Sequence, residues 1–181
     1  MKPLSQTVNT MNSLTRSDKA ITVRDLCFLS LAAALMFAIK LALSSLPNIN
    51  LNALIIILVT VFFGWKAMYT VCVYILLEGF FFGFGIWWLS YLIVWPLLAA
   101  LSMMLRKNSS PVLWAILAGL FGLAFGPLMY IIFFTITGGW EGFLPMWIAG
   151  IPYDLIHAIS NFLSVIVLFR PLSNVITRFV V

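Results

Sequence analysis

Long apolar segments follow one another along most of the chain and constrain its fold more than any other feature. They lie at about residues 26–46, 50–63, 67–83, 88–105, 111–136 and 146–169. Hydrophobic residues make up 64% of the 181 residues, and charged residues make up 8%. A water-soluble domain needs more charge to cover its surface, whereas a membrane protein has the bilayer as its solvent. The pattern predicts a multi-pass protein of the cell membrane, and we expect no separate soluble domain within these residues.

The lengths of the segments predict how often the chain crosses the bilayer. A spanning helix needs about 20 apolar residues. Segment 50–63 is shorter, which tilting or cover by neighbouring protein would accommodate. We therefore predict an all-α membrane protein in which residues 24–181 form a compact bundle of six transmembrane helices. Residues 1–23 are polar and lack the apolar stretch of a signal peptide, so we expect a cytosolic leader there.

The positions of the cations predict the orientation of the bundle. With six spans and a cytosolic N-terminus, the loops and ends on the inner face carry nine of the ten Lys and Arg residues. The tenth, Lys40, lies within an apolar segment, and the outer loops carry only Glu141. Cytoplasmic loops are enriched in Lys and Arg, so both termini are predicted to be cytoplasmic. The nine inner cations are Lys2, Arg16, Lys19, Arg24, Lys66, Arg106, Lys107, Arg170 and Arg178.

Several classes of function lack their usual signals in this sequence. The cations are scattered singly and form no basic run, which argues against nucleic acid as a partner. No phosphate-binding loop of the Walker type occurs. One histidine and two distant cysteines, Cys27 and Cys72, do not form the ligand set of a catalytic zinc. We expect a chain that is not an enzyme and that holds no metal or prosthetic group.

Ionisable residues in three different apolar segments are expected at similar depth. The predicted orientation places Lys40, Glu78 and Asp154 in the outer half of the bilayer. A charge at the centre of a membrane helix costs roughly 2.5 kcal/mol or more, so such groups face protein or a cavity. They form either a structural ion-pair network, with Lys40 bound to Glu78 or Asp154, or part of a ligand cavity. We expect Asp154 near the floor of such a cavity, with His157 and Asn161 below it.

The predicted outer loops combine flexible turns with large flat side chains. The PNIN turn at residues 47–50 offers two amides, GFGIWWLSY at residues 83–91 follows glycines with aromatic rings, and GGW at residues 138–140 repeats that pairing. Trp and Tyr also gather at membrane interfaces without binding anything. Above buried charges, however, these loops suit a lid over a pocket for an organic molecule. The candidate substrate-binding residues are Lys40, Asn48, Asn50, Glu78, Trp87, Trp88, Tyr91, Trp140 and Asp154.

Small residues recur at helical spacing in two segments. Ser30, Ala34 and Ala38 form a flat stripe in the first segment, where another helix can approach closely. This stripe suits either internal packing or the docking of a partner subunit. For Gly119, Gly122 and Gly126 in the fifth segment we expect internal packing, with a kink at Pro127.

From about residue 24 onward, the chain resembles the substrate-binding S components of energy-coupling factor (ECF) vitamin transporters. The resemblance rests on Ala34-x-x-x-Ala38, the PNIN turn, LLEGFFFGFGIWW and AGIPYDLIHAISNFLSVIVLFRPL. It implies high-affinity capture of a vitamin from outside and transport driven by partners, which are a transmembrane coupling subunit and two cytosolic ATPases that use ATP. It also implies that Ala34 and Ala38, with Ser30 on the same stripe, contact the coupling subunit.

The resemblance is closest to the subgroup associated with cobalamin (vitamin B12), so cobalamin is the expected cargo. Pantothenate, a pyrimidine precursor and a queuosine-type base remain alternatives that suit the Trp, Tyr and Asn content. Two other functions stay open. One is a six-helix membrane scaffold subunit without a small-molecule ligand. The other is an intramembrane enzyme or proton-coupled carrier that uses Glu78, Asp154 and His157.

Overall fold

All regular secondary structure in the described part of the chain is helical, which confirms the predicted all-α class. A computed structural model describes residues 20–46 and 48–180; residues 1–19 of the expected leader and Pro47 of the PNIN turn lie outside it. Two short 3-10 turns, η2 (Gly64–Lys66) and η3 (Trp140–Gly142), interrupt the α-helices. The α-helices are α2 (Val23–Ala42), α3 (Asn52–Phe63), α4 (Ala67–Phe82), α5 (Ile86–Met104), α6 (Pro111–Thr137) and α7 (Phe143–Val180).

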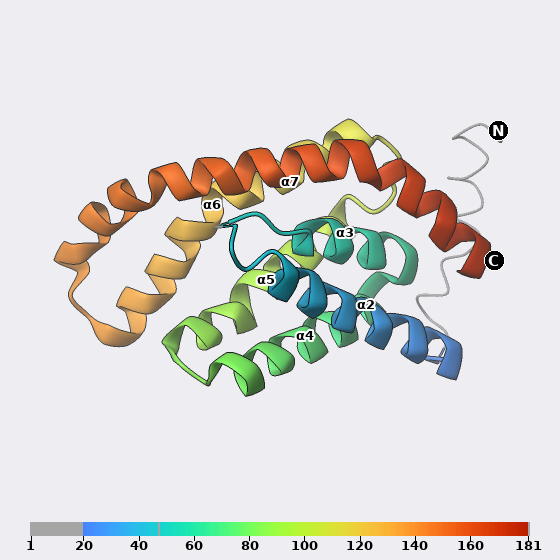
Figure 1. Cartoon of the computed structure of the whole chain (residues 1–181), viewed down its shortest axis with the longest axis horizontal. Helices are drawn as coiled ribbons and strands as arrows, with labels where there is room; N and C mark the ends of the chain where they lie inside the picture. Colours follow the sequence, from blue (N-terminus) through green and yellow to red (C-terminus); the bar gives the residue numbers. More distant parts are fainter. Residues whose placement is uncertain (1–19, 47, 181) are drawn as a thin grey trace.

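Five helical runs in the described residues are long and apolar enough to cross a membrane. One of these runs, Asn52–Phe82, contains both α3 and α4. Gly64 ends α3 with a φ of 62°, and the chain turns back at η2, so that α3 and α4 form a hairpin (Figure 1). The structure therefore matches a multi-pass membrane protein, whereas the number of six spans and the side of the termini stay predictions.

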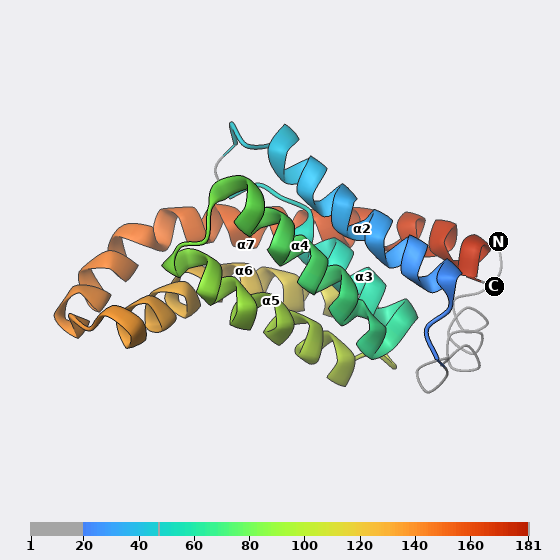
Figure 2. The same ribbon diagram turned by 90° about the horizontal axis from the view of Figure 1, so that it is seen from below.

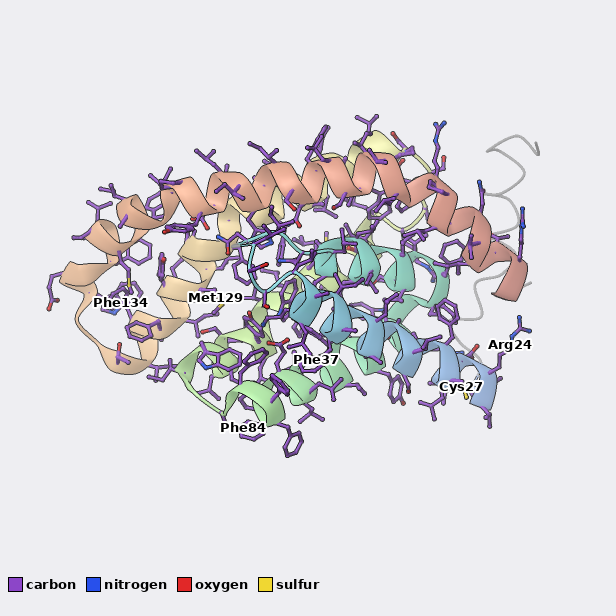
Figure 3. The ribbon with its side chains drawn as sticks, in the orientation of Figure 1. Arg24, Cys27, Phe37, Phe84, Met129 and Phe134 are labelled. Carbon is purple, nitrogen blue, oxygen red and sulfur yellow. The ribbon has the colours of Figure 1, made fainter. Side chains whose placement is uncertain are left out.

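The bundle has a clear long axis with different segments at its two ends. The start of α2, the turn η2, the α5–α6 connection and the end of α7 lie toward one end (Figures 1 and 2). The α4–α5 and α6–α7 turns lie toward the other. In Figure 3, Arg24 and Cys27 mark the first end, while Phe84 and Phe134 mark the second. The α6–α7 hairpin extends beyond the other helices at this second end.

Helix α2 begins earlier than the sequence pattern indicated because polar side chains close its first turn. The Thr22 hydroxyl accepts a hydrogen bond from the Asp25 N–H at 3.1 Å, and the Asp25 carboxylate accepts one from the Thr22 N–H at 3.2 Å. This reciprocal pair is a capping box. Lys66 in η2 lies 3.0 Å from the same carboxylate and joins the start of α2 to the α3–α4 hairpin.

Helix α3 is the centre of the bundle. All of its residues from Asn52 to Phe63 are buried, and α2, α4, α5, α6 and α7 all contact it. A helix that is apolar all round belongs in the interior of a large assembly of helices. Its C-terminal carbonyls are satisfied from the α5–α6 connection, since Arg106 donates to the Val61 oxygen at 2.8 Å and to the Phe62 oxygen at 3.3 Å.

Glycines let α6 and α7 approach each other closely. A Cβ added to Gly122 would lie 2.9 Å from the Ala158 Cα and backbone nitrogen, so no side chain fits there without moving α7. Asn161 adds a hydrogen bond across the same contact, from its Nδ2 to the Ala118 oxygen at 3.3 Å. Helix α6 changes direction about halfway along (Figure 1), as expected for the proline at position 127 within it.

Helix α7 continues beyond the last apolar segment, which ends at about residue 169. It runs to Val180 and contains Pro171. Leu172 and Ile176 pack against the hydrophobic core, and Ser173 is buried. Their tertiary contacts outweigh the one backbone hydrogen bond that a proline removes.

The small-residue stripe of α2 faces outward. Ser30, Ala34 and Ala38 are all exposed, whereas Leu29, Ala33 and Met36 on the inner face are fully buried. The stripe therefore does not serve internal packing within the described chain. Large apolar side chains are also exposed on α4, α5, α6 and α7, as expected where lipid rather than water surrounds the protein.

We predict that Gly122→Ala destabilises the protein, because its new methyl group meets backbone atoms of α7. Overpacking of this kind costs about 1–3 kcal/mol. Gly119→Ala on the same helix is the matched control, since its Cβ would lie 3.4 Å from the Phe162 Cβ, an ordinary contact. Thermal unfolding of both variants in detergent measures the difference. Equal melting temperatures for the two variants would contradict the close α6–α7 contact.

Candidate ligand cavity

A cavity lies beneath the connection between α2 and α3. Its volume is about 190 Å³. Each α-helix from α2 to α7 contributes at least one residue to its wall, and residues 43–46 and 48–50 of the α2–α3 connection cover it. The lining residues are Lys40, Leu43, Ser44, Leu46, Asn48, Ile49, Asn50, Asn52, Tyr74, Tyr91, Trp95, Phe125 and His157.

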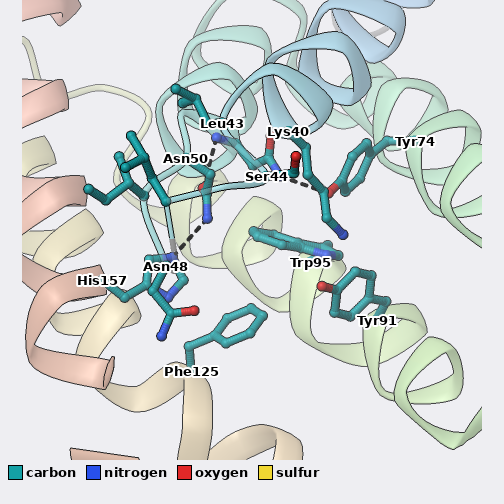
Figure 4. A pocket seen from close by; sticks show the side chains of 13 residues that line it. Lys40, Leu43, Ser44, Asn48, Asn50, Tyr74, Tyr91, Trp95, Phe125 and His157 are labelled. Atoms are coloured by element: carbon teal, nitrogen blue, oxygen red, sulfur yellow. Dashed lines mark hydrogen bonds between the residues drawn. The ribbon is translucent and has the colours of Figure 1, made fainter. Parts of the chain in front are cut away.

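Aromatic rings form one side of the cavity (Figure 4). The ring centres of Tyr91 and Trp95 lie 5.6 Å apart, and those of Phe125 and His157 lie 5.0 Å apart. Tyr91 also meets Phe125 at 6.3 Å, so the four rings form a connected wall. The interplanar angles of these three contacts lie between 68° and 80°, which is the edge-to-face geometry that aromatic pairs favour.

The charged residue on the wall is already paired. Lys40 of α2 forms a salt bridge with Glu78 of α4, whose side chain is completely buried. The Lys40 ammonium also lies 5.3 Å from the ring centre of Tyr91 and 5.1 Å from that of Phe82. An unpaired carboxylate in this position would be very costly, and the nearby rings add cation–π attraction for the ammonium. Of the two partners considered for Lys40, the structure therefore selects Glu78.

Two asparagines fix the cover of the cavity to the helices below. Asn48 donates from Nδ2 to the Tyr153 oxygen of α7 at 3.0 Å, and its φ of 58° is one that asparagine tolerates. Asn50 accepts from the Asn52 N–H at 3.1 Å, while its Nδ2 lies 3.4 Å from the His157 Nε2. The cover is thus attached to both α3 and α7.

The floor of the cavity contains polar atoms without partners. Asn52 donates from Nδ2 to the Tyr74 hydroxyl at 2.7 Å, but its Oδ1 has no hydrogen-bond partner among the described residues. The same holds for the Trp95 Nε1 and the His157 Nδ1. All three side chains are almost fully buried. An unsatisfied buried polar group costs about 1–3 kcal/mol. These three atoms are shielded from solvent, so a bound molecule would meet them only after their side chains turn toward the cavity.

The structure brings some of the candidate residues to the cavity and places others behind it. Lys40, Asn48, Asn50 and Tyr91 line the wall. Glu78 lies behind Lys40. The Trp87 ring contacts the Tyr91 ring in an edge-to-face arrangement, with 5.3 Å between the ring centres.

Three further candidates, Trp88, Trp140 and Asp154, do not line this cavity. Trp88 donates its indole N–H to the Ile75 oxygen at 2.8 Å and thereby joins α5 to α4. Trp140 is 51% exposed and packs against Phe134 and Phe143 at the tip of the α6–α7 hairpin.

The structure brings His157 rather than Asp154 to the cavity, contrary to what the sequence suggested. Asp154 accepts a hydrogen bond from the Gly126 N–H at 3.1 Å, directly before Pro127 in α6, and so supports the bend of that helix. His157, which we expected below the cavity, lines it. The two residues lie about one turn apart on α7, with Asp154 directed to the α6 backbone and His157 to the cavity.

Sequence reasoning missed most of the apolar wall. Trp95, Phe125 and Asn52 were not among the candidates, although the positions of Trp87, Tyr91 and Trp95 repeat every four residues and share one face of α5. That repeat is the signal that could have identified Trp95. Phe125 carries no comparable signal, since a phenylalanine in an apolar segment is ordinary.

Comparisons with known proteins found no relative of this chain. No protein-family model, no curated protein and no solved structure matches the chain. Within residues 20–46 and 48–180, no cluster of three or more His, Cys, Asp or Glu side chains could hold a metal ion. The cavity and its lining residues are therefore the basis for any functional conclusion.

We predict that Lys40→Met lowers stability by about 3–5 kcal/mol, because Glu78 is then left buried without a partner. Replacing both residues, as Lys40→Met with Glu78→Gln, removes both charges and should recover most of that loss. Melting temperatures of the wild type, Lys40→Met, Glu78→Gln and the double variant in detergent show whether the effects of the two substitutions are coupled. If the double variant loses as much as the two single variants together, the pair does not stabilise the bundle.

Proposed function

We propose that the chain is the substrate-capturing S component of an ECF-type importer in the cell membrane. Six spanning helices would enclose the ligand, and partner ATPases would supply the energy for transport. The cavity beneath residues 43–50 carries this proposal, because α2 to α7 all contribute to one partly polar site with a cover of its own. Ligand sites of small organic molecules have this combination of rings and a few placed polar groups.

The distribution of charge supports an outward-facing cavity. Lys66 and Arg106 lie in the connections at the end of the bundle where α2 begins, and Arg178 lies near the end of α7. By the positive-inside rule this end is cytoplasmic, and the termini would lie there too. The cavity is at the other end of α2, next to Lys40, and would therefore open to the outside.

The exposed stripe of α2 supports docking to a membrane partner. Ser30, Ala34 and Ala38 are small and exposed, and Leu31 and Leu35 beside them are 68% and 50% exposed. Without a hydrophobic driving force in lipid, close backbone approach over small residues is a main source of helix association. The transmembrane coupling subunit is the partner that the family resemblance implies for this face.

The size of the cavity favours the smaller of the cargoes considered. A cavity of roughly 150 Å³ is enough for benzene, and this one measures about 190 Å³. Cobalamin, a macrocycle larger than a drug-sized molecule, needs far more than the roughly 300 Å³ at which drug-sized pockets begin. It would require residues 43–50 to move away. The cover would have to move less for pantothenate, a pyrimidine precursor or a queuosine-type base. We therefore favour a cargo of their size over cobalamin.

We predict that Ala38→Leu or Ala34→Leu separates the chain from its partners while the fold persists. The bulkier side chain keeps a partner helix at a distance but meets no atom of the chain itself, because both positions are exposed. The measurement is co-purification of the tagged chain from its native membrane, with mass-spectrometric identification of a coupling subunit and ATPases. Ala149→Leu, at an exposed alanine of α7, is the matched control.

Two results would contradict this function. One is a wild-type chain that purifies without any coupling subunit or ATPase. The other is an Ala38→Leu variant that retains both partners in wild-type amounts at an unchanged melting temperature.

A further inference from the structure

We infer that the cavity takes a neutral, flat heteroaromatic molecule of one or two rings, and that Glu78 sets this selectivity by neutralising Lys40. The inference rests on the proposed capture function and deepens it by naming the chemical class of the ligand. Three properties of the cavity lead to it: its charge, its rings and its unpartnered polar atoms.

The paired charge on the cavity wall disfavours a charged ligand of either sign. Lys40 is the one charged side chain among the described residues that line the cavity, and its ammonium is bound to the Glu78 carboxylate. Glu78 is fully buried, and the partly exposed Lys40 reaches the wall above it. A carboxylate ligand would have to compete with Glu78 for the ammonium, and a cationic ligand would meet that ammonium. Either would lose its hydration without a free counter-charge, which is costly.

The rings select a flat molecule. Tyr91, Trp95 and Phe125 border the cavity together with the His157 imidazole (Figure 4). Contacts between aromatic rings are worth about 0.5–1.5 kcal/mol each beyond the area that they bury. A ligand with one or two rings uses these contacts and also fits a volume of about 190 Å³. A flexible aliphatic ligand of equal size would gain less and lose more rotational freedom.

The unpartnered atoms select a heteroaromatic ring over a hydrocarbon. The Trp95 Nε1–H is a donor without an acceptor, and the Asn52 Oδ1 is an acceptor without a donor, within the described part of the chain. Both atoms belong to residues that line the cavity. Once these side chains turn toward a ligand, a ring nitrogen or carbonyl would satisfy the first, and an amino or ring N–H group would satisfy the second. A site with buried polar groups of this kind rejects an analogue that lacks the matching groups.

The inference is tested by measuring how the purified full chain in lipid nanodiscs binds a set of small probes and one large probe. Nicotinamide, cytosine and adenine are neutral; nicotinate, orotate and pantothenate are carboxylates; 1-methylnicotinamide is a cation; and cyanocobalamin is the large probe. Thermal shift and calorimetry rank their affinities. We expect the tightest binding from a neutral ring. A carboxylate, the cation or cyanocobalamin binding tightest would overturn the ligand class and leave capture standing, whereas binding by none would overturn both.

Two variants test the role of Glu78. In Glu78→Gln the ammonium of Lys40 loses its counter-charge, so nicotinate should bind at least about tenfold tighter than to the wild type, as expected for a charge-assisted hydrogen bond. In the double variant Lys40→Met with Glu78→Gln, this gain should vanish. If nicotinate affinity is the same in Glu78→Gln and the wild type, or if the gain persists in the double variant, Glu78 does not set the charge selectivity.

The Trp95 donor has a test of its own. Trp95→Phe keeps an aromatic ring and removes the indole N–H, so the best neutral probe should bind about tenfold more weakly. Trp114→Phe is the matched control, because Trp114 is equally buried but donates to the Asn108 oxygen, away from the cavity. Equal affinity in Trp95→Phe and Trp114→Phe would remove Trp95 from the site.

Discussion

The salt bridge between Lys40 and Glu78 is the interaction on which the arrangement of α2, α4 and the cavity depends. Two charges inside a bilayer are tolerable only when they satisfy each other, and their pairing requires α2 and α4 to lie side by side at that depth. The Thr70 hydroxyl adds a bond to the Leu29 oxygen at 2.9 Å, and Lys66 adds the contact to Asp25. Polar contacts at three positions along α2 thus hold it against α4 and the turn before it, where lipid provides little hydrophobic driving force for helix association.

The shortness of α3 explains why a cavity exists at all. Its 12 residues span roughly 18 Å at 1.5 Å per residue, whereas the hydrocarbon core of a bilayer is about 30 Å thick. The five surrounding helices extend past its N-terminus, and the space above it would be empty if nothing replaced the missing turns. Residues 43–46 and 48–50 and the cavity beneath them occupy that space, with Asn52 at the start of α3 as part of the floor.

The sequence predicted the features that follow from hydropathy and missed those that follow from side-chain packing. It indicated the helical class and the positions of the apolar segments, because the bilayer penalises exposed backbone and charge so strongly. It could not decide whether Lys40 meets Glu78 or Asp154, since it predicts a similar depth for both. Nor could it place Trp140, because the length of the α6–α7 hairpin beyond the bundle depends on how α6 bends near Pro127.

The same buried contacts that shape the cavity also fix which face of α2 looks outward. Hydrogen bonds are directional, so the contacts of Asp25 with η2 and of Leu29 and Lys40 with α4 leave α2 little freedom to rotate about its axis. These three residues share one face of the helix, and Ser30, Ala34 and Ala38 therefore lie away from it and are exposed. One helix thus presents a wall residue to the ligand cavity and a flat stripe to the membrane. A change in its rotation would alter both surfaces at once, because a rigid helix cannot turn one face alone.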